Sequence, residues 1–139
     1  MSRIDQFVQS HSADILTSPV KPNIDTIREA EELLTFTFGK QLNSYLTTYG
    51  FLIYQFIELH GINERQKMSS DLIINTQKAR ENFGDLEGFV VIENLGGGNY
   101  ILCDEQDQVH EYLPMNEKKM KPLKLTFDEY VINRFNEID

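Results

Sequence analysis

The sequence predicts an α+β fold, with a central, mainly antiparallel sheet, helices packed on it, an N-terminal helical hairpin and a C-terminal helix. Between Gly88 and Leu113, three short runs of β-branched and aromatic residues are separated by clusters of Gly, Asn and Asp, which is typical of an antiparallel meander. Segments with apolar residues at helical spacing precede this meander, and one more follows it. Strands and helices do not alternate regularly, as a parallel βαβ arrangement would require.

Length and composition indicate one globular domain. The chain has 139 residues, of which 40% are hydrophobic and 25% charged, and such a chain can bury a core without disulfides. We expect a single domain over residues 1–139, in which residues 1–22 form an N-terminal helix and linker and residues 23–137 form the core. Cys103, the single cysteine, lies in an apolar run and is expected to be a small buried side chain.

Neither a secretion signal nor a membrane span is predicted. No apolar run approaches the roughly 20 residues that cross a bilayer. The first residues include Asp5 and have no continuous apolar stretch of the kind found in signal peptides. We therefore expect a cytoplasmic protein that does not bind a membrane.

The N-terminal residues 2–17 are predicted to form a helix, because Ser2 can cap it and apolar residues make a partial stripe along it. Residues 18–23 are expected to be a linker, since each of their two prolines disfavours helix at the preceding residue. Two roles remain open for this segment. It is either a helix that covers the sheet or an adaptable N-terminal arm.

A helical hairpin is predicted for residues 24–34 and 40–49, which both have apolar residues at helical spacing. The first of these helices can be capped by Asn23 or Asp25, and glutamates occupy its early and middle turns. Gly39 is expected to supply a left-handed backbone between the two helices. The apolar stripes of both helices must cover another part of the molecule.

The next elements are two short strands and a helix. Residues 51–54 and 56–59 are rich in β-forming side chains and are predicted strands, and the polar residues 63–70 are predicted to form an exposed loop. A helix is predicted over residues 76–83, with Asn75 as its cap.

The C-terminal part is predicted to contain a loop and a helix. The lysine-rich residues 115–124 carry a proline and are expected to be a loop. Residues 126–137 are expected to form the last helix, because Thr126 and Glu129 match the capping-box pattern and apolar residues follow at helical spacing.

Motifs for nucleotide, metal and hydrolytic sites are incomplete. The triplet from Gly96 to Gly98 is followed by strand-like residues and has no Lys or Arg near it, so it predicts a turn and not a phosphate loop. The histidines are scattered, and a single cysteine cannot complete a zinc site. Residues 104–107 are acidic but lack the glycine and closing glutamate of a calcium-binding loop. We expect no metal, no cofactor and no enzymatic activity.

Negative charge is concentrated in one part of the chain. The formal net charge is −9 and the pI about 4.8, which disfavours direct binding of nucleic acid. No Lys or Arg occurs from Glu81 to Glu117, although carboxylates are frequent there. This block is either a solvated face or a contact surface for a basic partner, and charge alone leaves both open. The candidate partner-binding residues are carboxylates and tyrosines of the meander and its flanks: Glu87, Glu93, Tyr100, Asp104, Glu105, Asp107, Glu111 and Tyr112.

Four segments carry a resemblance to a known family. Residues 27–50 (IREAEELLTFTFGKQLNSYLTTYG) are similar to a family pattern of helix, short turn and second helix ending in Gly. Residues 56–62 (FIELHGI) resemble its strand and turn, and residues 75–112 its helix, strand, Gly-rich turn and Tyr-containing strand. Residues 125–135 (LTFDEYVINRF) are similar to its terminal helix. In this order and spacing, the segments resemble the SUKH superfamily of Smi/Knr-type and Syd-type proteins.

The resemblance implies an α+β fold and a binding function. Bacterial members are commonly immunity proteins, which bind a polymorphic or contact-dependent toxin, often a nuclease, and block it. The expected partner is then a basic toxin domain, contacted by carboxylates and by Tyr100 or Tyr112 as anchors, and the protein is expected to be a monomer or a weak homodimer. The alternative is a regulatory scaffold for an endogenous partner, such as a cell-wall regulatory factor. A small hydrolase would need a cluster of titratable groups that the sequence does not show.

Overall fold

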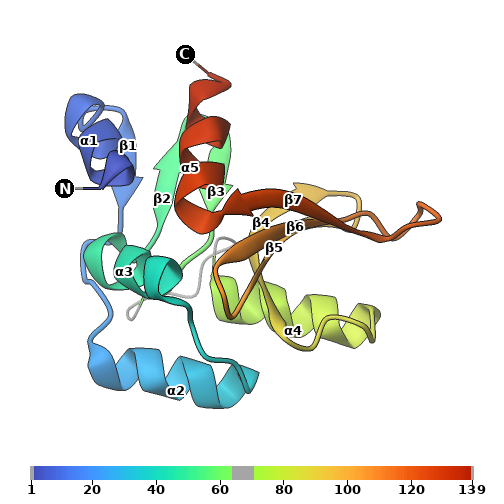
Figure 1. The fold of residues 1–139 in the computed structure, drawn as a ribbon. Helices are drawn as coiled ribbons and strands as arrows, with labels where there is room; N and C mark the ends of the chain where they lie inside the picture. Colours follow the sequence, from blue (N-terminus) through green and yellow to red (C-terminus); the bar gives the residue numbers. More distant parts are fainter. Residues whose placement is uncertain (1, 64–70, 139) are drawn as a thin grey trace.

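The computed structural model describes residues 2–63 and 71–138. The first half contains α1 (Arg3–Ser10), β1 (Ile15–Thr17), α2 (Ile24–Leu34), α3 (Lys40–Tyr49), β2 (Leu52–Tyr54) and β3 (Ile57–Leu59). The second half contains α4 (Leu72–Asn82), β4 (Phe89–Gly96), β5 (Asn99–Asp104), β6 (Gln108–Tyr112), β7 (Met120–Thr126) and α5 (Phe127–Asn136) (Figure 1). Of the loop predicted at 63–70, Asn63 is buried and the other residues lie outside the described part of the chain.

The strands form two antiparallel sheets. One has the order β1-β2-β3 and the other the order β4-β5-β6-β7. They meet where His60, which follows β3, donates its backbone N–H to the carbonyl of Ile92 in β4 at 2.7 Å. The α+β class and its antiparallel pairing are therefore confirmed, with the strands divided between two sheets.

The meander is the best-predicted part of the fold. β4, β5 and β6 are consecutive antiparallel neighbours, and the glycine triplet lies at the turn between β4 and β5. The φ angles of Gly96, Gly97 and Gly98 are 88°, 65° and 81°, values that side chains other than glycine rarely adopt. The interpretation of the triplet as a turn is confirmed.

β7 is a strand where the sequence predicts a loop. It pairs with β6 on one side only, for example Tyr112 with Met120, and so forms an edge of the sheet. Lysine and proline, here Lys121 and Pro122, are common on edge strands because they prevent pairing with another chain. The lysines and the proline that suggested a loop are therefore residues of an edge strand, where they prevent pairing with another chain.

The helical hairpin and the last helix are confirmed. Asn23 is the cap of α2, and its side chain accepts a hydrogen bond from the N–H of Thr26 at 2.9 Å. Thr126 and Glu129 form the predicted capping box of α5. Gly39 differs from the prediction, because its φ is −64° and the left-handed residue after α2 is Thr35, with φ 48°.

The helix predicted over residues 2–17 is only partly correct. α1 ends at Ser10, and residues 15–17 form β1, which pairs with β2. The β-branched Ile15 and Thr17 suit a strand, and pairing with β2 satisfies their backbone groups where the prolines stop a helix from continuing. α1 packs beside α5, where Phe7 contacts the ring of Phe135 at a centroid distance of 5.2 Å.

α4 begins four residues earlier than predicted. Its cap is Asp71, whose side chain accepts from the N–H of Ile74 at 2.8 Å, and not Asn75. Leu72 and Ile73 are buried helix residues, whereas the sequence suggested a separate apolar segment. Burial of these side chains against the main core fixes the start of the helix.

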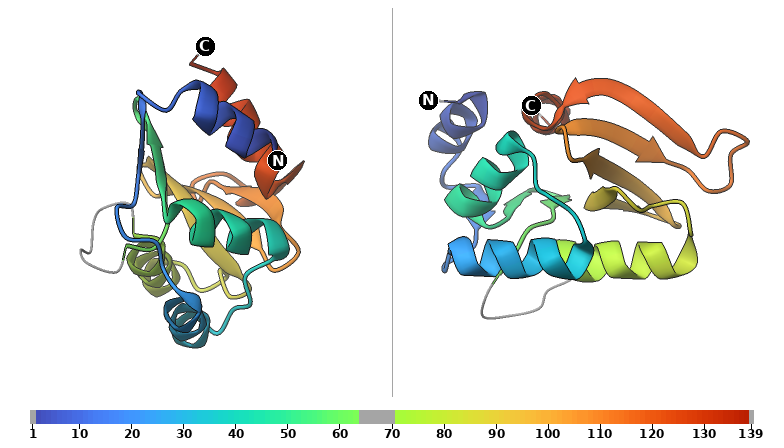
Figure 2. Two further views of the ribbon diagram at one scale, coloured as in Figure 1. Left: turned by 90° about the vertical axis from the view of Figure 1, so that its left-hand side faces the viewer. Right: turned by 60° about the horizontal axis from the view of Figure 1, so that its bottom comes forward.

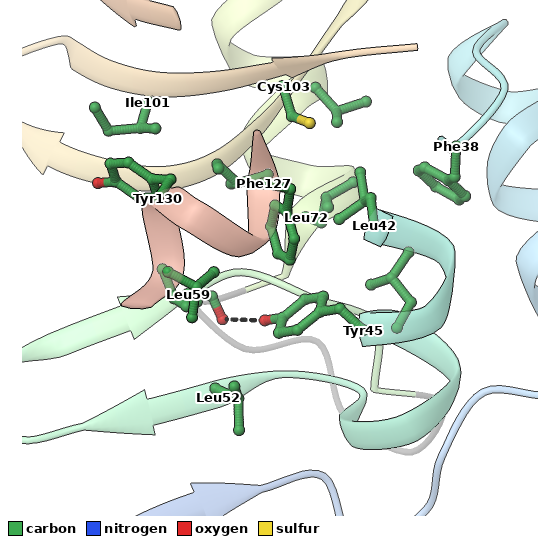
Figure 3. Close-up of a cluster of buried hydrophobic side chains, with 14 of the residues drawn as sticks. Phe38, Leu42, Tyr45, Leu52, Leu59, Leu72, Ile101, Cys103, Phe127 and Tyr130 are labelled. Carbon is green, nitrogen blue, oxygen red and sulfur yellow. Dashed lines mark hydrogen bonds between the residues drawn. The ribbon is translucent and has the colours of Figure 1, made fainter. Parts of the chain in front are cut away.

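The four-stranded sheet separates two hydrophobic clusters. Val90, Ile92 and Ile101 face the larger cluster, which also contains α5 and α3 side chains, and Val91 and Leu102 face the smaller one under α4. Figure 3 shows the larger cluster, where the hydroxyl of Tyr45 donates to the carbonyl of Leu59 at 3.0 Å. Cys103 is buried in it, as predicted. α2 and α4 lie end to end along one side of the molecule (Figure 2).

Candidate functional site

The eight candidate residues do not form one surface. Four of them, Glu93, Tyr100, Asp107 and Tyr112, are buried, with 3%, 7%, 7% and 2% of their area exposed. Asp104 and Glu111 are partly buried, and Glu87 and Glu105 are exposed.

Glu93 is part of a buried ionic network between β4 and α5. Its carboxylate accepts a hydrogen bond from the hydroxyl of Tyr130 at 2.6 Å and from Nη2 of Arg134 at 2.8 Å. Burial, together with the nearby carboxylate, raises the pKa of Tyr130 above its ordinary value. Hydrogen bonding to Glu93 also raises the pKa of Arg134, although burial acts to lower it. All the acceptor capacity of Glu93 is directed into the protein, so this carboxylate does not face a partner.

Tyr100 and Tyr112 are neighbours across β5 and β6 in the small cluster beneath α4. Phe83 meets both rings edge-on, at centroid distances of 6.3 Å and 5.3 Å. The expected aromatic anchors are therefore core side chains that hold the sheet to α4. The alternation of side chains along a strand predicts a buried tyrosine as readily as an exposed one, so only packing could decide.

Asp107 connects the β5–β6 turn to two helices. Its carboxylate accepts from the N–H groups of Gln41 at 2.8 Å and Leu42 at 3.1 Å, at the start of α3. Its carbonyl accepts from the N–H of Phe127, at the start of α5. A Cβ atom at Gly39 would lie 2.4 Å from this carboxylate, so a larger residue before α3 would displace the carboxylate from these N–H groups. The sequence signal for this role was Gly39 itself, because a helix that begins after glycine lacks a capping side chain of its own.

Asp104 organises the same turn from within. One carboxylate oxygen accepts from the N–H groups of Gln106 and Gln108, both at 2.9 Å. The other lies 3.1 Å from Nε2 of His110. Asp104 is thus mainly a turn residue.

Glu105 and Glu87 lie on an exposed acidic surface. Glu105 accepts from the N–H of Thr37 at 2.7 Å, which brings the β5–β6 turn against the connection between α2 and α3. A hollow there is lined by Arg28, Glu31, Glu32, Thr35, Phe36 and Glu105. A second hollow, which includes Thr35, Arg80 and Glu87, adjoins it. We call Glu31, Glu32, Glu87 and Glu105, which surround residues 35–37, the acidic surface.

Arg80 fixes the geometry of this surface and places one positive charge beside Glu87. Its Nη1 donates to the carbonyl of Leu34 at 2.6 Å, and its Nη2 donates to the carbonyl of Phe89 at 3.1 Å. Burial lowers its pKa, against the charge of Glu87. The hydrogen bonds of the guanidinium therefore go to backbone carbonyls, one of them in the last turn of α2. Glu32 and Glu87 are exposed to solvent.

Sequence reasoning missed Glu31 and Glu32, which lie outside the acidic block, well before its first residue, Glu81. Their signal was the crowding of glutamates in residues 24–34, which the favourable field at the start of a helix explains equally well. Glu31 also accepts from the N–H of Phe38 at 2.8 Å, so it shapes the connection to α3.

Glu111 lies apart from the acidic surface, in a groove between α5 and the four-stranded sheet. The groove has a volume of about 370 Å³, and we call it the α5 groove. Its lining includes Leu95, Ile101, Glu111, Leu123, Leu125 and Arg134. The side chain of Glu111 makes no hydrogen bond or ion pair with another residue within 2–63 and 71–138.

Within residues 2–63 and 71–138, no three or more His, Cys, Asp and Glu side chains are grouped so as to hold a metal ion. The helices in this part of the chain are all too short or too polar to cross a membrane.

Comparison with known proteins identifies the family. The family model described as "SMI1-KNR4 cell-wall" (SUKH_5) matches residues 4–136, so the match includes α1 as well as the segments whose resemblance was noted. A crystal structure of a protein from Pseudomonas syringae pv. tomato superposes with a TM-score of 0.74 at 16% identity, covering 96% of this chain and 98% of that one, and at this identity it shows a shared fold. No curated protein sequence matches. The chain belongs to the SMI1-KNR4 family, within the SUKH group that its segments resemble.

Proposed function

We propose that this protein is a cytoplasmic immunity protein, which binds a cognate toxin domain and neutralises it without catalysis of its own. The observation that carries the proposal is the acidic surface. Its four carboxylates come from α2, the loop before β4 and the β5–β6 turn, and they gather around residues 35–37. Membership of a family whose bacterial members are commonly immunity proteins supports a function in protein–protein binding.

The toxin that fits such a surface is a nuclease. A nuclease binds phosphate groups through Lys and Arg, and an acidic surface is complementary to such a site. The net charge of −9 acts in the same direction, because it speeds the encounter with a basic protein and repels nucleic acid. The bound protein would then block access of the substrate to the toxin.

The second candidate is a regulatory scaffold. The description of the matching family refers to the cell wall, which favours an endogenous factor of wall metabolism as the partner. Both candidates use binding and not catalysis. They differ in where the partner is encoded, since an immunity protein is expected beside the gene of its toxin.

Co-purification with the product of the adjacent gene tests the proposal, followed by kinetic measurement of the complex. We expect Glu32→Lys combined with Glu87→Lys to weaken the complex roughly tenfold, mainly through slower association. The salt dependence of association should become flatter in the double variant. These two side chains are exposed, so the changes should leave the fold intact.

Glu58→Lys is the matched control, because Glu58 is an exposed glutamate on β3, outside both hollows. It should leave the association rate close to that of the wild type. Asp104 and Asp107 are unsuitable for this test, since their carboxylates bond backbone N–H groups. If the adjacent product does not bind, the immunity function is wrong. If it binds the double variant and the wild type equally, the acidic surface is not the contact.

A further inference from the structure

The α5 groove takes residues from every strand of the second sheet, and its aliphatic part is lined by Leu95, Ile101, Leu123 and Leu125, while α5 and its C-cap contribute Tyr130, Asn133, Arg134 and Glu137. Leu95 comes from β4, Ile101 from β5, and Leu123 and Leu125 from β7, and α5 closes the other side. It shares no lining residue with the two hollows of the acidic surface. It is therefore a separate face of the protein.

Two large apolar side chains are exposed at this groove. Leu95 has 41% of its area exposed, and Phe56, in the turn between β2 and β3, has 74%. The ring of Phe56 lies 5.6 Å from Cζ of Arg134, so it stands next to the groove lining. Single exposed apolar residues are common on protein surfaces. Two that border one aliphatic groove are typical of a binding surface.

The charges of the groove favour a cation from outside. Arg134 is already bonded to Glu93 at 2.8 Å and to Glu137 at 2.5 Å, so two carboxylates share its charge. Glu111 is partly buried beside the leucines, and its carboxylate has no hydrogen bond or ion pair in the described part of the chain. Its cross-strand neighbour is Lys121, yet no ion pair joins them there. A carboxylate beside apolar side chains is stabilised when a cation reaches it.

We infer that the α5 groove is a second contact surface, which receives an arginine side chain, flanked by apolar residues, from a protein partner. The arginine stem packs along Leu95, Leu123 and Leu125 while its planar guanidinium bonds the carboxylate of Glu111. Arginine fits better than lysine because the guanidinium donates two parallel hydrogen bonds to one carboxylate. The inference extends the proposed function to another face, and its test does not need the toxin.

The test uses the protein labelled at its Leu and Ile methyl groups and titrated by NMR at millimolar peptide concentration. The probe is the capped tripeptide Leu-Arg-Leu, and the matched probe replaces Arg by citrulline, which has the same shape without the charge. We expect the arginine peptide to shift the methyl signals of Leu95, Leu123 and Leu125, and the citrulline peptide to bind at least several-fold more weakly. Glu111→Gln should reduce binding of the arginine peptide to that of the citrulline peptide. Lys121→Gln should strengthen it, because a competing cation is removed.

The methyl signals of Ile24 and Leu33 are the internal control, because both side chains are exposed on α2. Shifts confined to them, equal shifts with both peptides, or full binding by Glu111→Gln would each overturn the inference. Absence of any shift at the groove would overturn it as well. A self-associated protein whose dimer is lost in Phe56→Ser would show that a second copy occupies the groove, which also contradicts it. None of these outcomes bears on the acidic surface or on the toxin.

Discussion

The guanidinium of Arg134 donates from Nε and Nη2 to the carboxylate of Glu93, at 3.1 Å and 2.8 Å, and thereby ties the last helix to β4. The two residues are 41 positions apart, and the Glu93 side chain has only 4% of its area exposed. Glu93 lies at an irregularity of the pairing between β4 and β5. The sequence presented this residue as one of many surface carboxylates.

Arg134→Leu should lower the free energy of unfolding by about 3–5 kcal/mol, because it leaves a buried carboxylate without its cation. Urea denaturation at neutral pH measures this change. Glu137→Gln is the matched control, since it removes the other carboxylate that bonds this guanidinium. The side chain of Glu137 is 60% exposed. This substitution should cost less than about 1 kcal/mol. Equal losses in the two variants would show that burial of Glu93 contributes nothing.

Asp107→Ala should destabilise the protein by about 1–3 kcal/mol, because two N–H groups at the start of α3 lose their acceptor. The left-handed φ of 62° at this position adds to the loss for alanine. Asp107→Asn should cost less, since asparagine keeps a side-chain oxygen and tolerates this backbone. The melting temperatures of the two variants are measured by thermal unfolding. Glu105→Gln, a change at an exposed residue of the same turn, is the reference variant. Equal melting temperatures for the alanine and asparagine variants would contradict the capping role.

His60 should make the protein less stable in weak acid. It is 2% exposed, neither ring nitrogen has a hydrogen-bond partner in residues 2–63 and 71–138, and burial lowers its pKa from 6.5 to about 4. Between these values the unfolded chain binds a proton that the folded protein does not, so stability falls as pH falls. The contribution of neutral His60 to the free energy of unfolding is complete above pH 6.5. It decreases by about 3 kcal/mol as the pH approaches 4.

Urea denaturation between pH 7 and about pH 5 measures this pH dependence of stability. The range is chosen because most carboxylates titrate below it. His60→Leu should flatten the pH dependence and leave stability at pH 7 unchanged or higher, because no hydrogen bond is lost. His110→Gln is the control and should keep the dependence. An unchanged slope in His60→Leu would assign the acid sensitivity to other groups.

Gly61→Ala should cost roughly 3 kcal/mol or more, because a Cβ atom there would lie 1.6 Å from the carbonyl oxygen of Gly50. The two backbone segments are already joined by the N–H of Ile62, which donates to that same oxygen at 2.9 Å. Gly97→Ala is the matched control. Its surroundings are open and its φ is +65°, so only the backbone strain of roughly 1–2 kcal/mol applies. Chemical denaturation distinguishes them, and similar losses would show that the close approach near Gly61 is easily relieved.

Local sequence patterns predicted the elements whose partners are near in the chain. The capping box of Thr126 and Glu129, the cap of α2 by Asn23 and the turn at the glycine triplet all involve residues within a few positions of one another. Elements that depend on distant partners were misassigned. β7 looks polar because it is an edge strand, and the start of α4 is set by burial of Leu72 in the main core.

The candidate site shows the same division. The sequence predicted exposed charge correctly at Glu87 and Glu105, and it assigned the same role to Glu93 and Asp107, which are internal. A carboxylate is a surface group only if no cation or N–H group is folded against it. The partners of Asp107 are 65 and 66 residues away, so no pattern around it could reveal them.

By itself, the sequence determined the α+β class, the family resemblance, the acidic character and the meander between Gly88 and Leu113, because composition, periodicity and turn chemistry are local properties. The tertiary structure alone decided which carboxylates serve the fold and which face solvent. It joined Glu31 and Glu32 to Glu105, and it left Glu111 in a leucine-lined groove. The reason is physical: the state of a charged side chain depends on the groups that packing brings within a few ångströms of it, and those groups come from distant parts of the chain.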